Sequence, residues 1–152
     1  MDEPVKTGGR RRQSRELAVQ FLYQYDVSGG SDLRAAFAEF WPTQPDDQTN
    51  ARGFAEELIR GVVAQQAELD ERIKKYTEHW ELARIAAVDR NILRLAIYEM
   101  LFRDDIPPVV SINEAVDIAK KYSTRESGAF VNGILDRLRG DLPRPARTPA
   151  GN

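Results

Sequence analysis

Residues 83–103 read ARIAAVDRNILRLAIYEMLFR, and this stretch decides the fold. Its apolar residues recur at helical spacing on two adjoining faces. One face holds Ile85, Val88, Ile92, Leu95, Ala96 and Phe102, and the other holds Ala86, Leu93, Ile97, Met100 and Leu101. A surface helix has one apolar face, so a helix with two is expected to lie between two sets of neighbours. The remaining polar arc consists of Asp89, Arg90, Arg94 and Glu99.

Three helices are expected before this central one. The first begins near Arg11, where an apolar stripe starts, and ends at a pair of glycines. Ser31 is positioned to cap a short second helix that Pro42 stops. A long third helix is expected over residues 50–76, because apolar residues recur there at spacings of three, four and seven.

Two further helices are expected after the central one. The two prolines at 107 and 108 predict a turn over residues 104–108. Residues 111–114 read SINE and residues 123–126 read STRE, and both match the capping box that opens a helix. The last helix is expected to end at Gly140, and no segment has the alternation of a strand. The sequence therefore predicts an all-α fold.

Composition excludes several classes of protein. The chain has 152 residues, no cysteine and one histidine, so disulfides, thiolate chemistry and multi-histidine metal sites are excluded. No apolar run approaches the roughly 20 residues that span a bilayer, and the arginine-bearing N-terminal segment lacks the apolar h-region of a signal peptide. We expect a cytoplasmic protein without membrane segments.

The basic residues are concentrated near the N-terminus. The formal net charge is −2, yet five cations face only Asp2 and Glu3 before position 16. These cations are Lys6, Arg10, Arg11, Arg12 and Arg15. Cations oppose the dipole at a helix start, which suggests a role outside folding. The cluster is either a solubilising segment or, as we favour, a phosphate-binding patch, because arginine binds phosphate in a bidentate way.

A second polar cluster lies where the last two predicted helices meet. Residues 120–127 read KKYSTRES and combine cations, hydroxyls and a tyrosine. Such a set suits single-stranded nucleic acid, in which cations follow the backbone and an aromatic ring stacks on a base. The alternative is a capped turn in which Tyr122 is a core residue, and Phe130 would ordinarily be core as well.

No catalytic motif is present. The chain lacks a phosphate-binding glycine loop and a nucleophile elbow, and its carboxylates lie mainly on polar helix faces. His79 is expected to be a hydrogen-bonded or solvated residue at a helix junction. We expect no enzyme activity, no metal and no cofactor.

Four stretches of the chain resemble the NusB family of bacterial transcription antitermination factors. They are residues 11–23, RRQSRELAVQFLY; residues 87–99, AVDRNILRLAIYE; residues 112–120, INEAVDIAK; and residues 130–136, FVNGILD. The resemblance implies two three-helix bundles around a shared core, about seven helices in all, with a break in the central helix near residues 86–87. It also implies one helical RNA-binding domain over residues 10–140, and we expect disordered tails at 1–9 and 143–152.

The same resemblance implies a function. NusB-like proteins pair with the ribosomal protein NusE, and the pair binds the boxA element of single-stranded RNA. The resulting antitermination complex helps RNA polymerase to resist termination on ribosomal RNA operons. A homodimer that covers the RNA surface is the alternative oligomeric state. The runner-up function is a helical protein-interaction module without specific RNA binding.

The resemblance and the charge pattern together predict two sets of binding residues. The RNA-binding set is Arg10, Arg11, Arg12, Arg15, Tyr23, Lys121, Ser123, Thr124, Arg125, Glu126 and Phe130. The set for the protein partner is the polar arc of the central helix, Asp89, Arg90, Arg94 and Glu99.

Overall fold

The computed structural model describes residues 5–45, 49–77 and 81–143. The chain forms two compact units, residues 1–64 and 65–152. Within the described ranges there are seven α-helices and no strand, so the prediction of an all-α fold of about seven helices is confirmed. Of the disordered tails predicted at 1–9 and 143–152, residues 1–4 and 144–152 lie outside the described residues, as does His79. Residues 5–9 are helical, so the prediction of disorder is wrong there.

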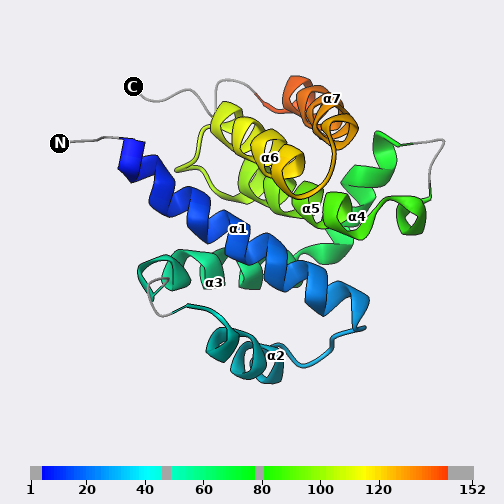
Figure 1. The fold of residues 1–152 in the computed structure, drawn as a ribbon. Coiled ribbons are helices and arrows are strands. Elements are labelled where there is room, and N and C mark those ends of the chain that lie inside the picture. Colours follow the sequence, from blue (N-terminus) through cyan, green and yellow to red (C-terminus); the bar gives the residue numbers. More distant parts are fainter. Residues whose placement is uncertain (1–4, 46–48, 78–80, 144–152) are drawn as a thin grey trace. The chain divides into compact units, whose positions relative to one another are not determined.

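The described residues of the first unit form three helices and one short 3-10 turn. They are α1 (Val5–Val27), α2 (Leu33–Phe40), η1 (Trp41–Thr43) and α3 (Thr49–Ala64). Helices α1 and α3 pack side by side (Figure 1). The Phe21 ring of α1 lies 4.8 Å from that of Phe37 and 5.2 Å from that of Phe40, centroid to centroid, so aromatic packing joins α1 to α2.

Two predicted helix starts in this unit are wrong. Helix α1 begins at Val5, earlier than Arg11, because glycine weakens a helix without ending it. Helix α2 is capped by Asp32, whose carboxylate accepts a 3.1 Å hydrogen bond from the Ala35 amide, and not by Ser31. Both residue types suit an N-cap, and Asp32 is the one that stands directly before the helix with an extended backbone (φ −120°, ψ 96°).

The second unit contains four helices. They are α4 (Gln66–Lys75), α5 (Ala87–Phe102), α6 (Pro108–Tyr122) and α7 (Arg125–Asp141), with the 3-10 turn η3 (Leu82–Arg84) before α5. Helices α6 and α7 pack side by side, and α5 contacts both of them as well as α4 (Figure 1). Helix α5 therefore has neighbours on more than one face, as its two apolar rows predict.

Two long predicted helices are interrupted. The helix predicted over 50–76 breaks at Gln65, where ψ is 14° and the backbone leaves the helical region. The step from Val62 to Leu69 is seven residues, which a continuous helix also allows, so the apolar spacing gave no signal of this break. The central helix begins at Ala87, because Ile85 and Ala86 are extended. The break that the family resemblance implied is thus confirmed.

The two predicted capping boxes are also wrong. Helix α6 already begins at Pro108, which is tolerated in the first turn because its amide would be unpaired there. Ser111 is therefore inside the helix, and its hydroxyl donates a 2.7 Å hydrogen bond to buried Glu99. Helix α7 is capped by Thr124, which accepts from the Ser127 amide at 2.9 Å, and not by Ser123.

A tyrosine fastens the end of α7 to the end of α4. The Tyr76 hydroxyl donates to the Asp141 carboxylate, and Arg137 donates to the Tyr76 carbonyl at 3.3 Å. Burial and the hydrogen bond to Asp141 raise the pKa of Tyr76 to about 12. The same bond is the main reason that the pKa of exposed Asp141 is lowered.

Candidate nucleic-acid interface

The arginines in the N-terminal half of α1 differ in their access to solvent, and none lies at the start of the helix, because α1 begins at Val5. Arg10 and Arg11 are exposed, Arg12 is half-buried, and Arg15 is only 3% exposed. The Arg11 guanidinium lies 4.0 Å from the centroid of the Phe54 ring, and that of Arg15 lies 5.7 Å from it. The prediction that Arg15 contacts RNA directly is therefore wrong, because its side chain is packed inside the protein.

Helix α1 is held in place at these arginines. The Ser14 hydroxyl is buried and donates a 2.8 Å hydrogen bond to the Ala51 carbonyl of α3. The Phe54 ring under Arg11 also belongs to α3. Cation–π contacts orient a guanidinium without consuming its N–H donors, so Arg11 remains able to bind phosphate. Tyr23, further along α1, is 38% exposed.

The turn between α6 and α7 presents the second predicted set. Lys121, Thr124, Arg125 and Glu126 are exposed, and Ser123 is half-buried. Tyr122 is 50% exposed, and the Lys121 ammonium lies 5.2 Å from its ring centroid. Of the two alternatives for Tyr122, an accessible ring is therefore confirmed and a core position is wrong.

A chain of hydroxyl groups fixes this turn. The Ser127 hydroxyl donates to the buried Asp89 carboxylate of α5 at 2.8 Å. The same oxygen lies 2.8 Å from the Ser123 hydroxyl and receives a 3.1 Å hydrogen bond from that of Thr124. The first turn of α7 is thus tied to the first turn of α5. We name Asp89, Ser123, Thr124 and Ser127 the hydroxyl network.

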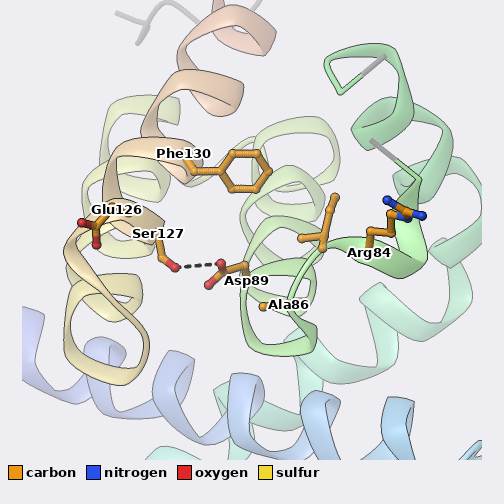
Figure 2. A pocket seen from close by; sticks show the side chains of 7 residues that line it. Arg84, Ala86, Asp89, Glu126, Ser127 and Phe130 are labelled. Atoms are coloured by element: carbon orange, nitrogen blue, oxygen red, sulfur yellow. Dashed lines mark hydrogen bonds between the residues drawn. The ribbon is translucent and has the colours of Figure 1, made fainter. Parts of the chain in front are cut away.

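A pocket of about 250 Å³ lies beside the hydroxyl network. Figure 2 shows Phe130 of α7 and Arg84 on different sides of it, with the Asp89–Ser127 hydrogen bond on a third. Ile85 and Ala86 contribute apolar surface to the lining. Phe130 is half-buried, so its ring is partly accessible to a ligand from this pocket. Oxygen Oδ1 of Asp89 is buried without a hydrogen-bond partner in the described part of the chain.

The polar residues of α5 do not form the solvated arc that the sequence predicts. Asp89 is 7% exposed, Arg94 4% and Glu99 1%, and Arg90 is half-buried. Each has a partner: Asp89 accepts from Ser127, Glu99 accepts from Ser111, and Arg90 donates to backbone carbonyls before α5 at 3.0 and 3.3 Å. The expectation of an exposed surface is therefore wrong, because neighbouring elements cover these groups.

Arg94 makes the most extensive of these contacts. Its Nε lies 2.7 Å from Asp70 Oδ1 of α4, and its Nη2 lies 3.1 Å from Asp70 Oδ2. Nη1 donates to Asn91 at 3.2 Å. A guanidinium bound at both edges of its fork and buried to this extent joins two helices, which explains why an arginine is found in the core.

The contact between Lys120 and Gly128 is not predicted by the sequence pattern. A Cβ atom added to Gly128 would lie 2.8 Å from Lys120 Cγ, so the lysine stem crosses α7 where the glycine leaves room. A glycine inside a helix was the available signal, because it costs about 1 kcal/mol relative to alanine and indicates close packing. Arg84 was missed because no pattern marks the residue at a pocket edge.

No group of three or more potential metal-binding side chains occurs in the parts of the chain described. None of the described helices is long and apolar enough to cross a membrane. The protein is all-helical in its described residues, and the α6–α7 turn of its second unit combines exposed cations, hydroxyls and an aromatic ring, a combination suited to binding single-stranded nucleic acid.

Comparisons with known proteins identify the family. The NusB family profile matches residues 12–139, and the chain belongs to the NusB family. It is 48% identical over 136 residues to the transcription antitermination protein NusB of Methylacidiphilum infernorum, covering 90% of this chain and 94% of the relative. It is 49% identical over 129 residues to that of Desulfitobacterium hafniense, covering 84% and 86%.

Solved structures agree with this assignment. NusB of T. maritima superimposes with a TM-score of 0.77 at 39% identity, covering 96% of this chain and 98% of that one. A chain from the crystal structure of the antitermination factors NusB and NusE in complex with double-stranded RNA gives a TM-score of 0.73 at 29% identity, covering 88% and 98%.

Proposed function

We propose that this protein is a transcription antitermination factor that binds boxA-type single-stranded RNA together with the ribosomal protein NusE. In this role it promotes processive transcription of ribosomal RNA operons within an RNA polymerase antitermination complex, in the cytoplasm and without catalysis. The observation that carries RNA and NusE binding is the similarity, over most of the chain, to a structure that holds NusB, NusE and double-stranded RNA. The accessible rings of Tyr23 and Phe130 favour a single strand, whose unpaired bases can stack on them.

We assign RNA binding to two surfaces, one in each unit. The first is the α1 surface, Arg10, Arg11, Arg12 and Tyr23. The second is the α6–α7 surface, Lys121, Ser123, Thr124, Arg125, Glu126 and Phe130. The exposed cations support phosphate contacts, and the accessible rings support base stacking. Arg15 is buried beside the Phe54 ring, and Arg11 stacks on the same ring. We therefore assign Arg15 to the packing that positions Arg11 rather than to direct RNA contact.

For NusE we propose a narrower set than the sequence predicts. Arg94 and Glu99 are buried and hydrogen-bonded within the protein, which argues for a role in the fold rather than direct contact. Arg90, which is half-buried, is the residue of the predicted set that a partner can reach most easily.

A protein-interaction module without specific RNA binding is the second candidate. The exposed apolar side chains of Phe102, Val109 and Val110, which are 38–43% exposed, favour it, because such residues often contact other proteins. Fluorescence anisotropy with a boxA-like RNA and a scrambled RNA of equal composition separates the two functions. We expect tighter binding of the boxA-like RNA.

The same titration is then repeated with NusE present. NusE brings its own cations to the RNA, so we expect it to tighten RNA binding by about 5- to 150-fold, the usual range for two coupled sites. Equal affinity for both RNAs, with and without NusE, would support the interaction module instead.

A further inference from the structure

The hydrogen-bond directions in the hydroxyl network follow from the chemistry of Asp89. A carboxylate only accepts hydrogen bonds, so the Ser127 hydroxyl uses its single proton to donate to Asp89 Oδ2, 2.8 Å away. Ser127 then has no proton left for its other two neighbours. The Ser123 hydroxyl, 2.8 Å away, must therefore donate to Ser127, although distance alone leaves the donor open.

Thr124 is oriented in the same way. Its hydroxyl donates to Ser127 Oγ at 3.1 Å and accepts from the Ser127 amide at 2.9 Å. Ser127 Oγ thus donates one hydrogen bond and accepts two, which is the full capacity of a hydroxyl group. The buried carboxylate of Asp89 sets the direction of all three hydroxyl protons, each of which points into the protein.

Solvent can reach two of the three hydroxyl groups, those of Ser123 and Thr124. Thr124 is exposed and Ser123 half-buried, while Ser127 is 7% exposed. Because their protons are committed inward, Ser123 and Thr124 have only lone pairs for a ligand. They can accept a hydrogen bond, but they cannot donate one to a phosphate oxygen, which is itself only an acceptor.

We infer that Ser123 and Thr124 recognise hydrogen-bond donors of RNA, with Asp89 as the buried positioning residue that imposes this polarity. The inference rests on the proposed RNA binding and specifies what this part of the α6–α7 surface reads. RNA offers two kinds of donor, the ribose 2′-hydroxyl and the N–H groups of the bases. Phosphate contacts at this surface are left to Lys121 and Arg125, which are exposed cations.

The test is a cycle between a protein variant and modified RNAs. Ser123→Ala removes the accepting oxygen at a half-exposed site, and Ser31→Ala, at an exposed serine of the other unit, is the control. The probe is a boxA-like single-stranded RNA with 2′-fluoro substitutions at single positions, which remove the ribose donor. A second series replaces adenosine by purine riboside and guanosine by inosine, which removes a base amino group. A third series carries single methylphosphonates, which remove the phosphate charge.

We expect Ser123→Ala to weaken binding of the unmodified RNA by about 2- to 10-fold, the usual value of one hydrogen bond. At one RNA position, either the 2′-fluoro substitution or the removal of the amino group should weaken binding to the wild type by the same factor as Ser123→Ala does. The same RNA modification should not weaken binding to the Ser123→Ala variant any further. The series in which that position occurs identifies the source of the donor. Ser31→Ala should bind every RNA like the wild type.

Other results would overturn the inference in distinguishable ways. If only methylphosphonate removes the effect of Ser123→Ala, the hydroxyl donates to phosphate, so the polarity is wrong while RNA binding stands. If Ser123→Ala binds as tightly as the wild type, the network does not read RNA. If the wild type does not bind the unmodified RNA, the proposed function fails as well.

Discussion

The ion pair between Arg94 and Asp70 allows a quantitative test of what holds α4 on α5. Its two N···O distances are 2.7 and 3.1 Å, and the side chains are 5% and 17% exposed, respectively. Asp70→Asn preserves shape but removes the charge. It also places a donor NH2 group opposite one guanidinium N–H, so one charge-assisted bond is lost and the other is weakened.

The expected loss of stability can be bounded. A hydrogen bond to a charged group contributes about 1.5–3 kcal/mol, and breaking a fully buried pair costs about 3–5 kcal/mol. Because Asp70 retains some contact with water, we expect Asp70→Asn to lower the free energy of unfolding by about 2–4 kcal/mol. For a chain of this length, the melting temperature should fall by about 5–15 °C.

The chain contains a matched control. Arg103 and Asp105 form the same two-pronged pair, with both N···O distances at 3.0 Å, but the Asp105 side chain is 52% exposed. Asp105→Asn should cost less than about 1 kcal/mol, because water screens an exposed pair. The two pairs differ in burial and in sequence separation, which is 24 residues for Arg94–Asp70 and 2 for Arg103–Asp105. The difference between the variants therefore measures what a buried pair between two helices adds over an exposed local one.

Thermal and urea unfolding followed by circular dichroism at 222 nm provide the measurement. Equal shifts for Asp70→Asn and Asp105→Asn would refute the argument from burial. RNA affinity below the melting transition should be unchanged in both variants, since neither aspartate belongs to the proposed RNA surfaces. A large loss of RNA affinity in still-folded Asp70→Asn would show that the α4–α5 contact does more than maintain the fold.

Three further predictions concern protonation, salt and base stacking. Because the pKa of Tyr76 is raised to about 12 in the folded protein, its contribution to stability should be complete below about pH 10 and be lost as the pH rises through 12. Ultraviolet titration at 295 nm should show a late-ionising tyrosine that Tyr76→Phe removes. The absence of such a tyrosine in the wild type would contradict the hydrogen bond between Tyr76 and Asp141. With Arg15 buried, about three to four phosphates are neutralised by the exposed arginines, so the logarithmic salt slope of RNA affinity should be about −2 to −3, and a slope near zero would exclude the basic patches. Phe130→Ala should weaken RNA binding by about 1–3 kcal/mol if the ring stacks on a base, measured beside the melting temperature, and unchanged affinity in a folded variant would leave Phe130 with a structural role only.

Several features of the fold follow from local sequence. The two apolar rows of the central stretch predict a helix with neighbours on more than one side, and α5 has them. The four family-like stretches predict the NusB fold, which the comparisons confirm. The helix starts were less predictable. Three serines suit an N-cap by residue type, namely Ser31, Ser111 and Ser123. The N-cap positions are instead occupied by the residues with extended backbone just before each helix, which are Asp32, Pro107 and Thr124.

The candidate RNA surface was predictable in part. The exposure of Arg10, Arg11 and Arg125 agrees with the expectation from charge, whereas the burial of Arg15 does not. All four are arginines near a helix start that the sequence predicts, so composition alone could not separate them. Only the neighbouring helix decides which guanidinium is packed away.

The sequence by itself determined that the chain is all-helical, that α5 is central in its unit and that the family is NusB. These properties depend on periodicity and residue type, which are local. Only the tertiary structure decided the roles of Asp89, Arg94 and Glu99. A polar residue on a helix is exposed unless another segment supplies its partner, and here Ser127, Asp70 and Ser111 come from three other helices. Spacing within one helix carries no information about such partners, because they are brought together only by folding.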